Sequence, residues 1–178
     1  MAIELSSNYL SLEAFEEILR SNETLVLSEQ LKEGINNCRA YIDQKMAQTD
    51  HLIYGVNTGF GSLCNTAVGK EDLEELQRNL VCSHACGIGE EVPQEIVKRM
   101  LLLKVLGLSK GASGVRLETI ERLLFFYNNR IFPRVFQQGS LGASGDLAPL
   151  AHLSLPLIGE GEVYYENQLI KSSELNKK

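Results

Sequence analysis

The chain has 178 residues, 44% of them hydrophobic, and 17 Lys and Arg face 23 Asp and Glu for a formal net charge of −6. This length and apolar content suit one domain with its own core and exclude a disordered chain. The negative charge argues against nucleic acid or an anionic membrane surface as the main partner.

Helical periodicity dominates the sequence, because apolar residues recur at intervals of three and four. The predicted helices cover residues 11–20, 28–48, 70–86, 93–108 and 115–129, and a further apolar helix follows residue 146. Ser11, Ser28 and Ser113 stand at or before the first turns of three helices, where we expect them to act as N-caps. Pro133 is expected to stop the fifth helix.

Extended structure is predicted at three places only. Residues 25–27 are a short apolar run, and the glycine-rich stretch 52–69 contains a possible strand near residues 52–56. Residues 162–172 alternate around a tight turn at Glu166-Asn167, as in a hairpin. The predicted fold is therefore mainly α with minor β, in one domain over residues 1–178.

The N-terminus and the cysteines indicate the compartment. The first 20 residues carry four glutamates and lack the basic start and apolar run of a secretory signal. No apolar run approaches the roughly 20 residues of a transmembrane helix. The four cysteines are scattered along the chain, at Cys38, Cys64, Cys82 and Cys86. We expect a reduced, cytoplasmic protein with no membrane partner.

Glycines 139, 142 and 145 mark the most distinctive loop of the sequence. A P-loop needs Lys-Ser/Thr after its last glycine, and a hydrolase elbow around Ser144 needs a glycine at 146, but Asp146 stands at that position. A dinucleotide-binding fingerprint needs a different glycine spacing. One structural interpretation stays open, in which Ser144 or Asp146 caps a helix with Pro149 in its first turn.

A chemical interpretation accounts for each residue of Ala143-Ser144-Gly145. Attack of the Gly145 amide nitrogen on the Ala143 carbonyl, with loss of water, would form a five-membered ring, and Gly145 has no side chain to obstruct the approach. Loss of the Ser144 hydroxyl as water would leave an exocyclic methylene. The product, a methylidene-imidazolone, is an electrophile of a kind that ordinary side chains do not provide.

The sequence around this tripeptide, GSLGASGDLAPLAHLSLPLIGEGE at 139–162, resembles the electrophile loop of the histidine and aromatic amino-acid ammonia-lyases. YGVNTGFG at 54–61 and LQRNLVCSHACGIG at 76–89 are similar to two further signatures of that family, in the same order. The resemblance implies 4-methylidene-imidazol-5-one formed from the tripeptide, without metal or nucleotide. It also implies a supporting loop that includes Asn57, Gly61, Gly142 and Asp146.

Ala112-Ser113-Gly114 is a second copy of the tripeptide and acts as an internal control. Its surroundings are typical of a helix cap, so an Ala-Ser-Gly tripeptide alone is not sufficient for ring closure. Ring closure needs a fold that compresses the turn. We therefore expect the electrophile at Ser144 and not at Ser113.

Tyr54 on its own would be interpreted as a core aromatic whose hydroxyl is hydrogen-bonded. Within YGVNTGFG, the resemblance implies a catalytic base that removes the β-proton of an amino-acid substrate. Histidines on helices are usually structural, and we interpret His51 and His152 in that way.

Ser83-His84 is the position from which the substrate is inferred. A metal site with Cys82 and Cys86 is not expected, because His84 lies on a different helix face from these two cysteines. Family members specific for phenylalanine or tyrosine carry pairs such as Phe-Leu or His-Leu here, whereas histidine-specific members resemble Ser-His. An imidazole can hydrogen-bond another imidazole. The resemblance thus implies elimination of ammonia from L-histidine to give urocanate, the first step of histidine degradation.

The resemblance also implies that more chain is needed. Family chains are several times longer, with a central helical bundle and downstream active-site positions that are missing here, and their active sites combine subunits of a homotetramer. We expect an N-terminal portion that is inactive alone. Two alternatives stay open: a phenylalanine or tyrosine ammonia-lyase or aminomutase, and a catalytically inert scaffold or interaction domain, because fold does not imply function.

Overall fold

The computed structural model describes residues 2–48, 52–59, 65, 68–142 and 145–177. The α-helices are α1 Leu12–Arg20, α2 Glu29–Gln48, α3 Leu73–His84, α4 Gln94–Leu108, α5 Leu117–Asn128 and α6 Leu147–Ser154. The strands are β1 Ala2–Leu5, β2 Thr24–Leu27, β3 Ile88–Glu91, β4 Phe132–Pro133, β5 Phe136–Gln138, β6 Glu162–Tyr165 and β7 Gln168–Lys171. Short 3-10 helices follow at η2 Lys70–Asp72, η4 Leu155–Ile158 and η5 Ser172–Lys177. The prediction of a mainly α fold with minor β is confirmed.

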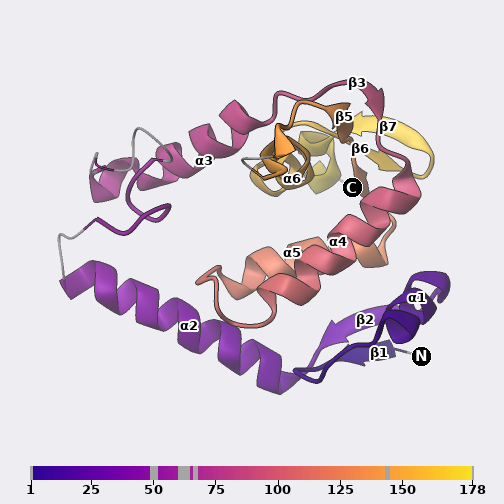
Figure 1. Cartoon of the computed structure of the whole chain (residues 1–178), viewed down its shortest axis with the longest axis horizontal. Coiled ribbons are helices and arrows are strands. Elements are labelled where there is room, and N and C mark those ends of the chain that lie inside the picture. Colours follow the sequence, from indigo (N-terminus) through magenta and orange to yellow (C-terminus); the bar gives the residue numbers. More distant parts are fainter. Residues whose placement is uncertain (1, 49–51, 60–64, 66–67, 143–144, 178) are drawn as a thin grey trace.

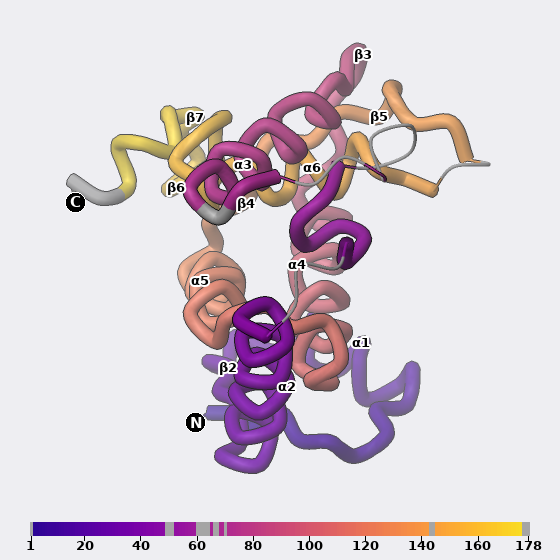
Figure 2. Tube along the Cα trace, turned by 90° about the vertical axis from the view of Figure 1, so that its left-hand side faces the viewer, coloured from indigo at the N-terminus to yellow at the C-terminus, as the bar shows by residue number. Residues whose placement is uncertain are grey.

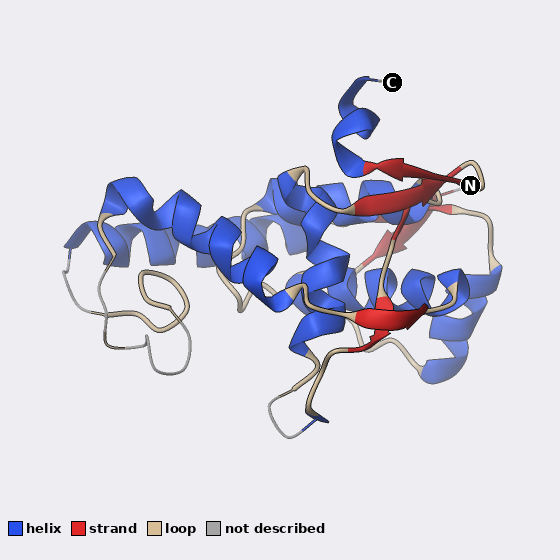
Figure 3. Cartoon of the chain, turned by 90° about the horizontal axis from the view of Figure 1, so that it is seen from above, coloured by secondary structure: helices blue, strands red, loops and turns tan. Residues whose placement is uncertain are grey.

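Helices α4 and α5 form the middle of the molecule and pack side by side (Figure 1). Strands β1 and β2 with α1 and α2 lie on one side of this pair, and α3, α6 and the other strands lie on the opposite side (Figure 2). Figure 3 shows the strands as short pieces among the helices rather than as one large sheet. The helices therefore carry the architecture.

The apolar sequence of α4 is buried on one face only. Val97, Leu101, Leu102 and Val105 are at most 1% exposed and pack in the core with α5. Leu103, between them, is 57% exposed. Within the described residues, no helix is both long enough and apolar enough to cross a membrane.

The N-terminal elements follow the predicted capping. The Ser11 hydroxyl accepts a hydrogen bond from the Ala14 amide at 3.2 Å, and the Ser28 hydroxyl accepts one from the Leu31 amide at 3.3 Å. The predicted strand at 25–27 is β2, which pairs in parallel with β1. These local signals were sufficient because each depends on side chains within three residues of the helix start.

The start of α5 differs from the prediction, and its end lies within one residue of the predicted Asn129 but is not set by Pro133. Ser113 does not cap the helix, which begins only at Leu117, because Gly114 has a φ of +69° and turns the chain before the helix can start. The helix also ends before Pro133. Arg130 adopts a φ of +54°, and the Ile131 amide donates to the Phe126 carbonyl at 2.9 Å, which is a Schellman motif.

The strand predicted near residues 52–56 is wrong, because these residues form a turn. The amides of Val56 and Asn57 both donate to the Ile53 carbonyl, at 3.0 and 3.2 Å. The Asn57 side chain closes the turn from the other side by accepting from the Ile53 amide at 2.7 Å. An asparagine that bonds its own local backbone competes with strand pairing.

The predicted C-terminal hairpin is confirmed. Strands β6 and β7 pair antiparallel, with Tyr165 opposite Gln168 next to the turn. Glu166 and Asn167 have φ values of +49° and +61°, as both central residues of a type I′ turn require. Strand β4 pairs with β6 and so extends the hairpin to three strands.

The side chain of Asn128 links α5 to β2. It accepts from the Leu25 amide and donates to the Leu25 carbonyl, both at 2.9 Å. We predict that Asn128→Ala lowers the free energy of unfolding by about 1 to 2 kcal/mol, because two backbone groups lose their partner. The shift in the urea midpoint measures this loss.

The neighbouring residue supplies the control for this experiment. Asn129 is exposed, and its side chain donates to the Phe125 carbonyl of its own helix at 2.8 Å. Asn129→Ala should change the free energy of unfolding by less than about 0.5 kcal/mol. Equal effects of the two substitutions would contradict the assigned role of Asn128.

Candidate active site

Two segments that are far apart in the sequence meet at a small cavity. The cavity has a volume of about 160 Å³ and lies between the end of α3 and the loop that leads into α6. Its lining includes Ser83, His84, Gly139, Ser140, Gly145 and Leu147. The structure therefore brings the predicted substrate-recognising pair together with Gly145 of the tripeptide.

A larger cavity lies elsewhere in the molecule. It has a volume of about 330 Å³ and is formed by β1, the residues after it, α1, α2 and the end of α4. None of the site residues predicted from the sequence lines it, within the part of the chain that the structure describes. The smaller cavity is the candidate active site, because the chemistry converges there.

The tripeptide loop is closed at its two described ends. The Gly145 amide donates to the Gly142 carbonyl at 3.3 Å, and the Leu147 amide donates to the Gly145 carbonyl at 3.0 Å. Gly145 has a φ of +89°, a conformation that suits glycine. Ala143 and Ser144 lie outside the described residues.

Of the two caps that the sequence offered for α6, Asp146 lies within the described residues and Ser144 does not. Asp146 stands at the N-cap position, but its side chain makes no capping hydrogen bond. The Ser140 hydroxyl instead accepts from the Ala148 amide at 3.3 Å. Sequence reasoning missed Ser140, because a cap eight residues from the amide depends on the path of the whole loop.

The ring of His84 is oriented by its own helix. Its Nδ1 lies 2.7 Å from the Leu80 carbonyl oxygen and 3.3 Å from the Ser83 hydroxyl. A carbonyl oxygen can only accept, so Nδ1 carries a proton and donates to Leu80. In the neutral ring Nε2 is then an acceptor nitrogen. The Ser83 hydroxyl also donates to the Leu80 carbonyl, at 3.0 Å.

Tyr54 is carried by a turn that precedes α3. Its side chain is 63% exposed, and the turn that carries it is bonded to the first half of α3 through Gln77, which donates to the Val56 carbonyl at 3.4 Å (Figure 1). Within the described residues, the cavity lining does not include Tyr54. Asn57 is buried in the same turn, and Gly61 lies outside the described residues.

The two segments that form the cavity touch through glycines. A Cβ on Gly139, whose φ is +139°, would lie 2.8 Å from the Gly87 Cα. A Cβ on Gly87 would lie 2.9 Å from the Nε2 of His152 in α6. The sequence marked neither close approach, because Gly87 and Gly139 are more than 50 residues apart.

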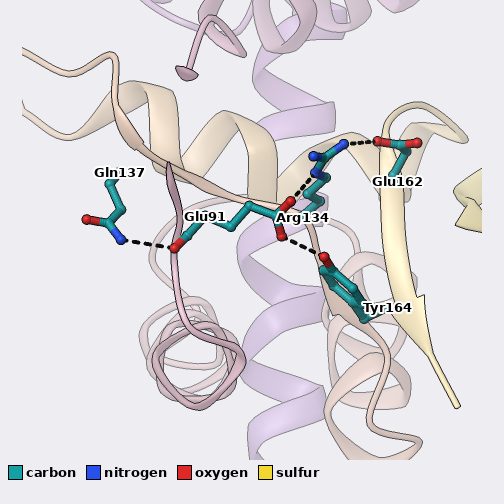
Figure 4. A network of polar contacts seen from close by, with 5 residues as sticks. All are labelled: Glu91, Arg134, Gln137, Glu162 and Tyr164. Carbon is teal, nitrogen blue, oxygen red and sulfur yellow. Dashed lines mark hydrogen bonds and ion pairs between the residues drawn. The ribbon is translucent and has the colours of Figure 1, made fainter. Parts of the chain in front are cut away.

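A polar network ties together the strands beside the cavity (Figure 4). Arg134 donates to Glu91 of β3 at 2.7 Å and to Glu162 of β6 at 2.6 Å. The Tyr164 hydroxyl donates to Glu91 at 2.7 Å, and Gln137 of β5 donates to the Glu91 carbonyl at 3.0 Å. The network joins the chain that follows Gly87 to the chain that precedes Gly139. Sequence reasoning missed these residues.

Comparison with known proteins identifies the class. Residues 10–178 match the family model for aromatic amino acid lyases, and the chain belongs to this family. Among curated relatives, the histidine ammonia-lyase of Legionella pneumophila (strain Lens) is 48% identical over 170 residues, which cover 96% of this chain and 33% of the relative. That of Geobacillus sp. (strain WCH70) is 45% identical over 172 residues, covering 97% and 34%.

Solved structures agree with this assignment. Histidine ammonia-lyase from Trypanosoma cruzi matches with a TM-score of 0.83 at 34% identity, over 99% of this chain and 34% of that one. The phenylalanine aminomutase of Pantoea agglomerans matches with a TM-score of 0.90 at 28% identity, over 99% and 34%. The chain spans about a third of the length of the curated relatives that it matches.

The close contact between Gly139 and Gly87 predicts that one added methyl group has a large effect on stability. Gly139→Ala should lower the free energy of unfolding by about 2 kcal/mol or more, because the new Cβ meets backbone and the φ of +139° is strained for alanine. A urea unfolding curve measures this change. Gly142→Ala is the matched control, since no described atom lies within 4 Å of its added Cβ. A Gly139→Ala protein as stable as the control would contradict the contact.

The network of Figure 4 predicts a pH dependence. The Tyr164 hydrogen bond, and then Arg134, hold the pKa of the Glu91 carboxyl below its ordinary value of 4.5. The unfolded chain therefore binds more protons just below pH 4.5, and the contribution of Glu91 to stability is lost as the pH falls through the lowered pKa. Above that window the contribution is fully present.

Glu91→Gln should remove this part of the acid sensitivity. Unfolding by urea at pH 6 and at about pH 3.5 should show a smaller drop in stability for Glu91→Gln than for the native chain. Glu90→Gln is the control, because Glu90 is exposed on the same strand and outside the network. Identical drops in all three proteins would refute the role of Glu91.

Proposed function

We propose that this chain forms the N-terminal third of a cytoplasmic histidine ammonia-lyase, which eliminates ammonia from L-histidine to give urocanate. The observation that carries the proposal is the cavity in which Ser83 and His84 face the loop of Gly145. The names of the relatives at 48% and 45% identity support the same substrate. The proposed role is the first step of histidine degradation.

The residues around the tripeptide fit a 4-methylidene-imidazol-5-one formed from Ala143, Ser144 and Gly145. Gly145 is exposed, adopts a φ of +89°, and has no described atom within 4 Å of the position of a Cβ. A backbone ring at this point therefore has room on the side of Gly145 and access to the cavity. The group supplies an electrophilic carbon that accepts the substrate amine and makes it a better leaving group. The proposed chemistry needs neither metal nor nucleotide.

His84 is proposed to recognise the substrate side chain. With Nδ1 donating to Leu80, the second nitrogen of its neutral ring accepts, which matches the N–H of a substrate imidazole. A phenyl ring offers no such donor. A site built to hydrogen-bond its substrate rejects an analogue that lacks the group, because polar atoms of the site then lose their partner.

Tyr54 is proposed as the base that removes the β-proton. Its side chain is exposed, and the turn that carries it is hydrogen-bonded to α3. Within the described residues, Tyr54 does not line the cavity of its own chain. We therefore propose that Tyr54 completes the site of another copy, in a homo-oligomer that is a tetramer in the whole protein. An exposed tyrosine, which has both an aromatic ring and a polar hydroxyl, suits an interface between copies.

A second candidate is a phenylalanine or tyrosine ammonia-lyase or aminomutase. The TM-score of 0.90 to the Pantoea agglomerans phenylalanine aminomutase favours it, because that protein shares the fold of this chain. The Ser83-His84 pair and the higher identity of the histidine ammonia-lyases favour the first candidate. The third candidate is a catalytically inert scaffold, and production of urocanate by the chimera described below would reject it.

The mass of this chain tests whether the electrophile forms. We expect a loss of about 36 Da, two waters, located by peptide mapping between Gly139 and His152. Ser144→Ala should reduce this loss to one water at most, because the second water comes from the Ser144 hydroxyl. Ser113→Ala is the control and should leave it unchanged. A loss that follows Ser113 instead of Ser144 would reject the assignment.

Activity is tested in a chimera. This chain replaces the N-terminal third of the Legionella pneumophila histidine ammonia-lyase, so that a complete polypeptide is present. We expect urocanate from L-histidine, and Tyr54→Phe should lower kcat by about 100-fold or more.

Replacing Ser83-His84 by Phe-Leu should shift kcat/KM toward L-phenylalanine. An unchanged substrate preference would reject the proposed role of Ser83 and His84, whereas turnover of L-phenylalanine or L-tyrosine by the native chimera would favour the second candidate.

A further inference from the structure

His152 lies behind the candidate active site rather than in its lining. It belongs to the second turn of α6, the helix whose N-terminal end follows the tripeptide. Its side chain is 8% exposed, and its ring lies edge-on to Phe136 of β5, with 5.2 Å between ring centroids. Burial lowers the pKa of the imidazole, which keeps the ring neutral at pH 7.

The neutral ring has one specific partner. The Gly87 amide donates to Nε2 of His152 at 2.9 Å. Gly87 is three residues beyond His84, in the turn that joins α3 to β3. A side chain thus fixes a backbone amide at the point where the chain leaves the substrate-recognising pair.

The atoms around Gly87 are closely packed, which restricts movement of its amide relative to His152. A Cβ at Gly87 would lie 2.9 Å from the His152 Nε2 and 3.1 Å from the Phe136 Cβ. On the other side, the Gly87 Cα is the atom that a Cβ on Gly139 would meet, at 2.8 Å. The turn is therefore held between α6 and the segment that leads from β5 into the tripeptide loop.

We propose that His152 is a positioning residue of the ammonia-lyase reaction, which fixes Ser83 and His84 relative to Gly145 through the Gly87 amide. The inference rests on the proposed function. One helix, α6, holds the electrophile loop at its N-terminal end and His152 in its second turn, so it sets the distance between the reacting group and the residues that recognise the substrate. His152 itself touches neither substrate nor electrophile.

Hydrogen–deuterium exchange of this chain tests the bond without any activity. We expect the Gly87 amide to be protected in the native chain and to exchange at least about tenfold faster in His152→Leu, which has no acceptor. His152→Gln keeps a neutral acceptor and should retain part of the protection. Equal exchange of the Gly87 amide in the native chain and His152→Leu would overturn the proposal.

The chimera tests the positioning role. In His152→Leu the loss of about 36 Da should persist, while KM for L-histidine rises about tenfold, the factor of a lost hydrogen bond of about 1.4 kcal/mol. The value of kcat should fall less than KM rises. His152→Gln should restore most of the native KM. An unchanged KM in His152→Leu, with the mass loss intact, would overturn the proposal.

Phe136→Leu is the matched control. It removes the aromatic ring that packs on His152 but leaves the bond to Gly87, so KM should stay near the native value. An equal rise of KM in Phe136→Leu would attribute the effect to packing and reject the positioning role. If the native chimera produces no urocanate, the proposed function fails, and exchange at Gly87 still decides the hydrogen bond by itself.

Discussion

The backbone of Gly87 passes so close to that of Gly139 that a single added methyl group would lie 2.8 Å from a backbone carbon. The candidate site depends on this approach, because it joins the chain after Ser83 and His84 to the chain before Gly145. Two segments without side chains at the contact can come closer than any other pair of residues. The cavity of about 160 Å³ is the space left beside this contact.

The contact is maintained from several sides. The core of α4 and α5 supports the strands, and the network of Glu91, Arg134 and Glu162 joins β3, β6 and the link between β4 and β5. His152 adds a bond from α6 to the same turn. The tripeptide loop is thus attached to rigid elements on both flanks, as a site needs when its groups must keep a fixed geometry.

The sequence was sufficient for features that depend on near neighbours. The caps at Ser11 and Ser28 and the hairpin turn at Glu166-Asn167 lie where the pattern predicted them, because each involves residues within three or four positions. The predicted start of α5 was wrong because of a local backbone conformation. Gly114, one residue after the supposed cap, turned the chain at a positive φ that the pattern does not display.

The site itself was predicted only in part. Motifs identified Ser83, His84 and the tripeptide loop, and the cavity includes Ser83, His84 and Gly145. The residues that hold this arrangement, Ser140, Arg134 and the pair of close glycines, were missed, since their roles arise from contacts between distant segments. No periodicity in a single sequence records such contacts.

The bond between Asn128 and Leu25 has a further consequence at the edge of the small β1–β2 sheet. A strand at the edge of a sheet offers an unpaired amide and carbonyl to any passing strand, which invites aggregation. The Asn128 amide group occupies both backbone groups of Leu25, in the way that a neighbouring strand would. At that residue the helix takes the place of a third strand and so protects a short, apolar edge from pairing with another molecule.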